Sequence, residues 1–289
     1  MARLHREVLI SLSVVLLLSL SSCGGAKRIQ VKSAMKETHQ EMMSGNFQKA
    51  LDTSHSAYQK YPKDPEILKN YINTIKHIKA RGDEAFDRED FVQAQITYDL
   101  LLEHFPRFIP FINQLSFERN DLITRHKMSQ ILEAEKQARS SLKKGDIQKA
   151  IDIYKDLYRQ HPRDIMVRDR YIRCLESIKG QADLDFKRED LALAGRTYKI
   201  LLKHYSSLNR LGRSLSYNSG LLNIKIENCR KILFENGLEK YRSGDLGQAI
   251  SIWRSILTFD PENPEVKKAV DRAILQSKNL ERNKLDDTK

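Results

Sequence analysis

The chain has 289 residues, with 50 lysines and arginines against 38 aspartates and glutamates, so its formal net charge is +12. Its 12 glycines and 7 prolines are few for this length, which favours long helices joined by brief turns. A basic chain often binds nucleic acid, but here the basic residues are interleaved with acidic ones. We therefore expect a solvated helical surface that favours anionic lipid headgroups or acidic partners.

The first residues have the layout of an export signal. Arg3 and Arg6 precede an uncharged apolar run from Val8 to Leu20. This order is typical of a secretory signal peptide. The run is also too short to cross a bilayer of about 30 Å as a helix, which takes roughly 20 residues. We therefore expect residues 1–22 to be removed on export.

The apolar run ends in Leu20-Ser21-Ser22-Cys23-Gly24, which resembles the lipobox of bacterial lipoproteins. The resemblance implies that Cys23 is lipidated and starts the mature chain, with residues 23–30 as a short linker. More than one acyl chain anchors a protein stably. The absence of aspartate after the cysteine implies an outer-membrane, periplasm-facing location in the cell envelope of a Gram-negative bacterium.

The alternative is an ordinary signal peptide that ends in this sequence by chance. In either case the chain is exported, and an exported protein meets little nucleic acid. We expect no nucleic-acid partner.

One small pattern occurs five times along the rest of the chain. A Gly or Glu followed by Asp or Asn leads into an apolar residue and then an alanine; the five alanines are Ala50, Ala94, Ala150, Ala194 and Ala249. Twelve residues before four of them stands a small residue: Gly82, Ala138, Ala182 and Gly237. A bulky apolar residue stands eight before each alanine. These offsets are close to multiples of 3.6, so each occurrence predicts two amphipathic helices around a tight turn.

A helix breaker closes four of the five occurrences. It stands twelve residues after the alanine, at Pro62, Pro106, Pro162 and Pro261. Proline cannot continue a helix interior, so these positions indicate that each second helix has ended. The small residue, the alanine, an aromatic residue four places later and the proline together resemble the tetratricopeptide repeat over nearly all of residues 31–275.

The resemblance implies an all-α fold, a right-handed α-solenoid of about five helical hairpins. The alanines are 44, 56, 44 and 55 residues apart, whereas a tetratricopeptide unit has about 34 residues. We expect elongated first helices in the shorter steps. In the longer steps, Arg107–Leu132 and Ser207–Arg230 leave room for either an additional helix or a kinked long one.

Because the steps alternate, the repeating unit is a pair of hairpins of about 100 residues. Gly82–Phe108 and Ala182–Leu208 align without a gap, which indicates an internal duplication. We divide the helical domain into residues 31–130, 131–230 and 231–275. A charged tail over 276–289 has little to bury, and we expect it to fray. The fifth repeat has the most regular tetratricopeptide pattern.

Two cysteines besides Cys23 occupy equivalent positions on predicted first helices, Cys174 and Cys229. Helices that are neighbours in such a stack lie on the order of 10 Å apart, which exceeds the limit of about 7 Å between the Cα atoms of a disulfide. We favour two buried free thiols. The alternative is a disulfide formed in an oxidising periplasm.

The remaining polar motifs do not indicate chemistry. His104, His161 and His204 recur at the ends of predicted second helices, where a histidine can meet the negative end of the helix dipole. Glu89 and Glu189 fall at predicted turns. The chain has no ligand spacing typical of a metal site, no nucleophile elbow, no phosphate loop and no dinucleotide fingerprint. We expect no enzyme activity, cofactor, metal or small-molecule substrate.

Stacked hairpins present their first helices on a concave face that binds peptides or partner helices. The candidate partner-binding face consists of residues on these helices that packing does not require: Lys79, Asp83, Asp87, Arg139, Lys143, Lys179, Asp183 and Lys187. The alternative for each residue is an ordinary solvated helix surface.

Together these features predict a lipid-anchored scaffold that binds another protein of the cell envelope. Similar architectures occur in the outer-membrane-protein assembly lipoprotein and in pilotin-like lipoproteins of type IV pilus systems. The resemblance therefore implies a role in outer-membrane assembly, secretion or pilus formation. The alternative is a peptidoglycan-associated adaptor that regulates cell-wall enzymes, as some tetratricopeptide lipoproteins do.

Overall fold

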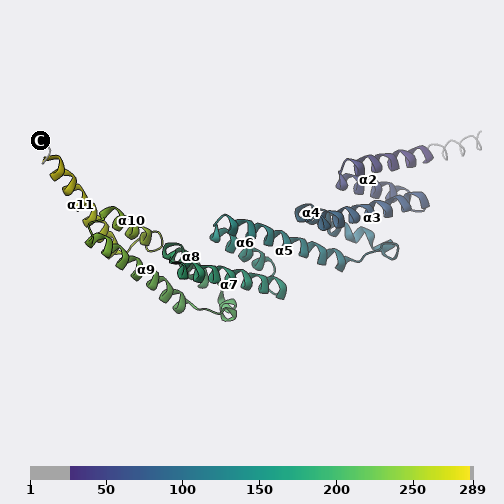
Figure 1. The fold of residues 1–289 in the computed structure, drawn as a ribbon. Helices are drawn as coiled ribbons and strands as arrows, with labels where there is room; N and C mark the ends of the chain where they lie inside the picture. Colours follow the sequence, from purple (N-terminus) through teal and green to yellow (C-terminus); the bar gives the residue numbers. More distant parts are fainter. Residues whose placement is uncertain (1–26, 287–289) are drawn as a thin grey trace, which may run out of the picture. The chain divides into compact units, whose positions relative to one another are not determined.

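The structure is a computed structural model that describes residues 27–286. The regular elements in this range are helices joined by short turns (Figure 1), so the prediction of an all-α array of helical hairpins is confirmed. By its internal contacts the chain divides into two compact units, Met1–Glu133 and Ala134–Lys289. Cys23 and the predicted signal peptide lie outside the described residues. Within them, no helix has the length and apolar character needed to cross a membrane.

The first unit contains two complete hairpins, in which α3 packs against both α2 and α4. Its elements are a helical segment over 27–43, α2 (Phe47–Lys60), α3 (Pro65–Asp87), α4 (Phe91–His104), the 3₁₀ segment η1 (Phe105–Gln114) and the first part of α5 (Arg119–Lys143).

The second unit repeats this order and adds one more hairpin. After the rest of α5 come α6 (Ile147–Gln160), α7 (Ile165–Lys187), α8 (Leu191–Tyr205), η2 (Asn209–Ser214), α9 (Ser219–Arg242), α10 (Leu246–Leu257) and α11 (Pro264–Asp286). From α6 onward each helix packs against the next one in the chain. Contacts between sequence neighbours are characteristic of repeat proteins.

The turn inside each hairpin contains one residue in the left-handed region, always five places before the signature alanine. Three of these residues are glycines, and Glu89 and Glu189 occupy the other two with φ of 60° and 64°. This region is open to glycine and costs other residues free energy. The prediction that both glutamates lie at turns is confirmed.

Aspartates begin most of the helices. Their carboxylates accept hydrogen bonds from backbone N–H groups of the first turn, which otherwise lack partners. These aspartates are Asp64, Asp90, Asp146, Asp164, Asp190 and Asp245.

The signature alanines lie where the two helices of a hairpin meet, and all five are fully buried. The small residues twelve places earlier face the same contact. A Cβ atom added at Gly82 would lie 3.0 Å from Cε1 of Tyr98, and one at Gly237 would lie 2.6 Å from Cδ1 of Trp253. Aromatic rings therefore fill the space that a larger residue would need.

The long steps between alanines have a single explanation in both units. A 3₁₀ segment follows the second helix, η1 in the first unit and η2 in the second, and a first helix of 25 or 24 residues comes next, α5 or α9. No additional α-helix forms between them. The 44-residue steps contain α3 and α7, each of 23 residues, which confirms the predicted elongation.

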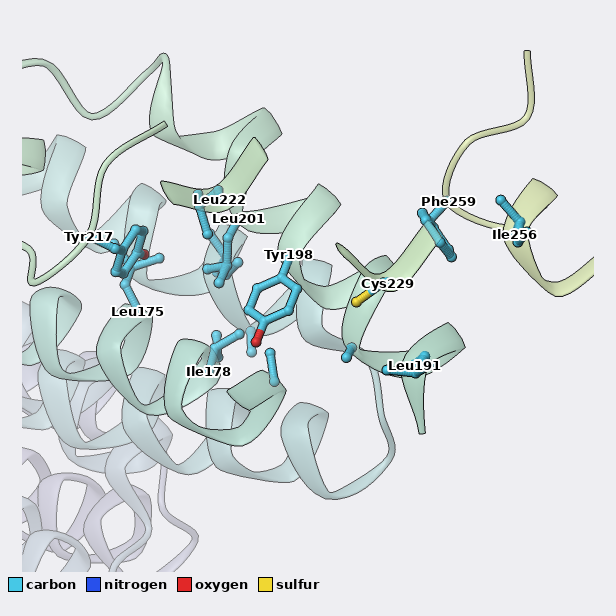
Figure 2. Close-up of a cluster of buried hydrophobic side chains, with 14 of the residues drawn as sticks. Leu175, Ile178, Leu191, Tyr198, Leu201, Tyr217, Leu222, Cys229, Ile256 and Phe259 are labelled. Atoms are coloured by element: carbon cyan, nitrogen blue, oxygen red, sulfur yellow. The ribbon is translucent and has the colours of Figure 1, made fainter. Parts of the chain in front are cut away.

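Each unit has its own hydrophobic core. In the first, Phe108 and Phe111 of η1 are buried beside Tyr71, and the rings of Tyr71 and Phe111 lie 5.3 Å apart in an edge-on arrangement. In the second, Tyr198 is fully buried in a core that includes Leu201 of the same helix and Cys229 of α9 (Figure 2).

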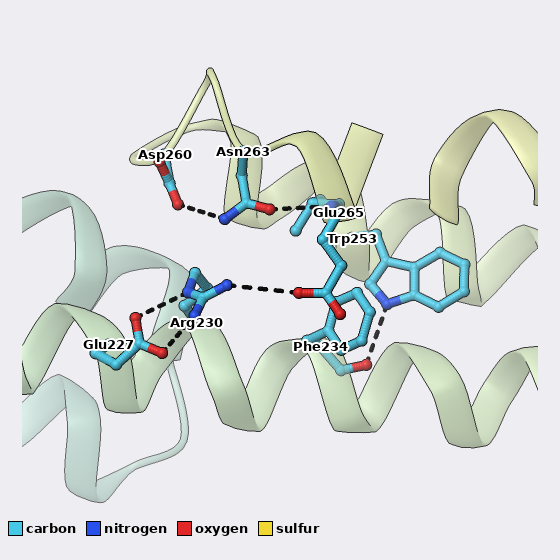
Figure 3. A network of polar contacts seen from close by, with 8 residues as sticks. Glu227, Arg230, Phe234, Trp253, Asp260, Asn263 and Glu265 are labelled. Atoms are coloured by element: carbon cyan, nitrogen blue, oxygen red, sulfur yellow. Dashed lines mark hydrogen bonds and ion pairs between the residues drawn. The ribbon is translucent and has the colours of Figure 1, made fainter. Parts of the chain in front are cut away.

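The last hairpins are joined by a polar network (Figure 3). The indole Nε1–H of Trp253 donates to the backbone oxygen of Phe234 over 3.1 Å. Arg230 of α9 pairs with Glu227 on its own helix and lies 3.9 Å from Glu265 of α11. These contacts fix α10 and α11 against α9.

The ends of the described range are more helical than expected. The segment over 27–43 includes residues 27–30, which we assigned to a linker. At the other end α11 continues to Asp286, through most of the tail that we expected to fray. Residues 278–282 are exposed, so the helix continues there without a core to cover.

Candidate protein-binding surfaces

The eight residues of the predicted partner-binding face lie on three first helices. Lys79, Asp83 and Asp87 are on α3, Arg139 and Lys143 are on α5, and Lys179, Asp183 and Lys187 are on α7. Their environments differ. Some are part of networks that hold the hairpins together, and others are open to solvent.

Asp83 and Asp183 belong to the networks. The Tyr98 hydroxyl donates to Asp83 over 2.8 Å, and Lys79 pairs with the same carboxylate over 2.5 Å. Tyr98 comes from α4, so the bond ties the second helix of the hairpin to the first. A structural role explains Lys79 and Asp83 without a ligand.

The second unit repeats this network and extends it. Tyr198 donates to Asp183 over 2.6 Å, Lys179 lies 2.7 Å away, and Lys225 of α9 lies 3.3 Å away. Burial raises the pKa of Asp183, but hydrogen bonds from Lys179, Tyr198 and Lys225 outweigh it and leave this pKa below its ordinary value. The carboxylate is ionised and anchors three helices.

The other residues of the predicted face are exposed. Asp87 and Lys187 end α3 and α7, and Lys143 ends α5. Arg139 is also exposed, and its guanidinium lies 3.4 Å from Glu135 one turn away. These four side chains are available to a partner.

A groove lies between consecutive first helices in each unit. In the first unit it is about 280 Å³ and is bounded by the segment over 27–43 and by α3; its polar lining includes His39, Asn70, Asn73 and His77. In the second unit it is about 560 Å³ and is bounded by α5 and α7; its lining includes Glu135, Arg139, Leu142, Tyr154, Arg170 and Arg173.

The two grooves are the same place in the duplicated unit, because their linings align with an offset of 100 residues. His39, Asn70 and Asn73 correspond to Arg139, Arg170 and Arg173. Of these three arginines only Arg139 was predicted from the sequence to lie on a binding face. A comparison of the two units position by position would have found the other two, which lie in the extended first half of α7.

A larger groove occurs on another side of the first unit. It measures about 1170 Å³ and is lined by the segment over 27–43, α2 and α4, with Val31, Ala57, Ile96 and Leu100 among its residues. More than half of the Ile96 side chain is exposed. This surface was not predicted, because two second helices form it together with the segment over 27–43 and the prediction covered first helices alone.

Burial keeps His104 and His204, near the ends of second helices, in their neutral form. Burial lowers the pKa of His104 and of His204. Gln48 lies 2.8 Å from Nε2 of His104, and Gln148 lies 2.6 Å from Nε2 of His204. An amide nitrogen can only donate, so each imidazole accepts in its neutral form. Burial disfavours the positive charge with which His104 and His204 would meet the helix dipole, and for His161 the interpretation stays a prediction.

Cys174 and Cys229 are buried free thiols, as predicted. Burial raises the pKa of Cys174 to about 12 and that of Cys229 to about 11. The thiolate is the reactive form, so neither residue is reactive at neutral pH. Among the residues that the structure describes, no three histidine, cysteine or acidic side chains converge in a way that could hold a metal ion.

One part of the chain matches a known protein family. The family model of the tetratricopeptide repeat matches residues 135–164, which cover the end of α5, all of α6 and the turn before α7. This is the third repeat; the fifth, which we considered the most regular, is not in the matched segment. No curated protein matches the chain. Tetratricopeptide repeats generally mediate protein–protein interaction, so the match and the fold indicate an interaction scaffold.

Proposed function

We propose that the protein is a lipid-anchored, periplasm-facing scaffold of a Gram-negative outer membrane that binds another envelope protein. The observation behind the binding role is the groove between consecutive first helices, which occurs in both units. In stacked helical hairpins such grooves accept peptides and partner helices.

The anchor and the location rest on the first residues of the chain. Cys23 follows an apolar run and two small residues, in the order that resembles a lipobox. A lipid anchor would hold the scaffold at the membrane and leave its grooves facing the periplasm. Outer-membrane assembly, secretion and pilus formation all use scaffolds of this kind.

We propose further that the protein acts by binding and not by catalysis. The buried thiols are held in their protonated form, and the half-buried carboxylates of Asp83 and Asp183 are occupied by tyrosine and lysine partners. Groups of these kinds stabilise the hairpins and leave no free nucleophile or base among them.

Replacement of Cys23 tests the anchor. Cys23→Ser removes the acylation point and should leave an uncleaved or soluble protein, whereas the control Ser21→Ala keeps a small residue and should fractionate with membranes like the wild type. Fractionation and mass spectrometry of the N-terminus measure both. Membrane association of a Cys23→Ser chain that has lost its signal peptide would refute the anchor.

Cross-linking in intact cells, followed by purification of the chain from solubilised envelope, tests the partner. A secretin or an outer-membrane barrel protein as the main cross-linked species supports the scaffold. A wall hydrolase or synthase would instead support the peptidoglycan-associated adaptor. Absence of any specific protein would reject both.

A further inference from the structure

The positive charge of the protein is concentrated in its second unit. Residues 1–133 contain 18 lysines and arginines against 16 acidic residues, a net charge of +2, whereas residues 134–289 contain 32 against 22, a net charge of +10. The two units share a duplicated fold, so the fold itself does not require this excess.

Part of the excess lies inside the groove between α5 and α7. Arg139, Arg170 and Arg173 line it together with a single acidic residue, Glu135. The equivalent groove of the first unit has His39, Asn70 and Asn73 at the same three positions. Three cations and one anion give this concave site a net positive charge. A ligand that binds in such a site loses water, so its charges interact with those of the site more strongly than they would on an open surface.

Arg170 is the most constrained of the three arginines. Its side chain is only 20% exposed, and one nitrogen of its guanidinium pairs with Glu135. Its Nε–H is buried and has no hydrogen-bond partner. A buried donor without a partner costs free energy, and that cost is recovered if Arg170 moves so that this N–H reaches an acceptor in the groove.

We infer that the groove between α5 and α7 binds an acidic segment of a partner protein, with carboxylates held by Arg139, Arg170 and Arg173. The inference rests on the proposed scaffold function and specifies the chemistry of what the scaffold holds. Arginine binds carboxylates through two parallel N–H donors, which gives both strength and direction.

The shape and lining of the groove favour a peptide over a membrane. Its volume of about 560 Å³ accommodates a few side chains, and Ala138, Leu142 and Tyr154 provide apolar surface beside the arginines. A segment that alternates acidic and apolar side chains fits both parts. A flat bilayer surface cannot enter a groove between two helices.

Binding of a defined probe tests the inference. The purified full chain in mild detergent is titrated with a short fluorescein-labelled peptide of glutamates and leucines, and with its counterpart in which every glutamate is glutamine. We expect fluorescence anisotropy to report binding of the glutamate peptide and at least about tenfold weaker binding of the glutamine peptide. Equal binding of both peptides would overturn the inference.

Two triple variants locate the binding. Arg139→His, Arg170→Asn and Arg173→Asn together give the second groove the residues of the first and should weaken glutamate-peptide binding at least about tenfold. The control, Arg196→Gln, Lys199→Gln and Lys203→Gln, removes the same charge from the exposed face of α8. It should lower affinity by less than about threefold. An equal loss in both variants would mean that the probe follows general charge, and the groove would have no special role.

Cross-linking separates this inference from the scaffold proposal. If intact cells yield a protein partner with the wild type and an equal amount with the three-arginine variant, the groove inference fails and the scaffold stands. If the peptide binds as expected but no protein partner is captured by the wild type, the scaffold proposal fails. Loss of the partner from that variant alone, with unchanged helicity and melting, supports both.

Discussion

The two units of this protein keep the same internal contacts and differ in what they present to a partner. The pair Tyr98–Asp83 recurs as Tyr198–Asp183, and the pair Gln48–His104 recurs as Gln148–His204. Both pairs connect different helices. Residues that fix one helix against another are thus retained in both copies of the duplicated unit.

The surfaces have diverged over the same offset of 100 residues. On the second helix, Ile96, Asp99 and Glu103 of α4 correspond to Arg196, Lys199 and Lys203 of α8. The first unit therefore has an apolar and acidic second-helix surface, whereas the second unit has a basic one. The comparison shows that this repeat tolerates changes of charge outside the contacts between helices, so two copies can serve different partners on one framework.

The largest predicted effect is on the free energy of unfolding. It compares alanine substitutions at two glycines where the helices of a hairpin meet. Gly237→Ala would place a methyl group against Trp253, which cannot move without losing its hydrogen bond to Phe234. Overpacking of this kind costs about 1–3 kcal/mol. Gly82→Ala should cost almost nothing, because the second unit has Ala182 at the equivalent position and alanine favours a helix by roughly 1 kcal/mol. Urea unfolding measures both; equal losses would contradict the assigned contacts.

The next prediction concerns the half-buried carboxylate of Asp183 in the second unit. Asp183→Asn should lower the free energy of unfolding by roughly 1–2 kcal/mol at neutral pH, since it removes the charge that Lys179 and Lys225 face. The folded pKa of Asp183 is lowered. Its stabilisation is therefore complete above the unfolded pKa of about 4 and is lost as the pH falls through the folded value.

The difference between wild type and Asp183→Asn should accordingly shrink in acid, which urea unfolding at several pH values can follow. Asp169→Asn is the control, because Asp169 and Arg168 form an exposed pair that contributes little. A difference that does not change with pH would mean that the charge of Asp183 is not what stabilises the hairpin.

A third prediction concerns the 3₁₀ segments. Phe111→Leu gives the first unit the residue of the second, Leu211, beside which a hollow of about 680 Å³ lies. We expect a loss of about 1 kcal/mol, because the leucine cannot reproduce the ring contacts to Tyr58 and Tyr71. Thermal melting of the variant measures it. An unchanged melting temperature would show that η1 adds little to the core.

The smallest predicted effect is an increase in the stability of the protein. Glu89→Gly and Glu189→Gly should each stabilise the protein by roughly 0.5–1 kcal/mol, since glycine adopts positive φ without a steric penalty. The reverse change at the equivalent turn, Gly145→Glu, should destabilise it by a similar amount. The same urea titrations measure all three. Destabilisation by both glycine variants would mean that contacts of the glutamate side chains stabilise the turns by more than the positive φ costs.

Most of the fold could be predicted from the spacing of apolar and small residues along the chain. Offsets of 8 and 12 residues from each alanine located every hairpin, because helix packing imposes this periodicity on the sequence. They could not distinguish an extra helix from a 3₁₀ segment in the long steps. That outcome depends on whether Phe105, Phe108 and Phe111 find a place in the core, which is a matter of tertiary contacts.

The candidate face was predicted less completely. Periodicity identifies which residues packing does not need, but it does not show that Asp83 lies within reach of Tyr98, which is 15 residues away in the chain. It also could not show that Arg170 and Arg173 share a groove with Arg139, because the extended start of α7 has no counterpart in a standard repeat. Both facts depend on how two helices are placed in space.

Trp253 of α10 is the only tryptophan of the chain, and its side chain lies almost fully buried against α9. Its fluorescence therefore reports the environment of the last hairpins alone, whereas circular dichroism reports helices throughout the protein. If unfolding spreads gradually along the array, the two signals will change at different denaturant concentrations. The natural sequence thus contains a local optical probe for how far cooperativity extends from one end of the chain.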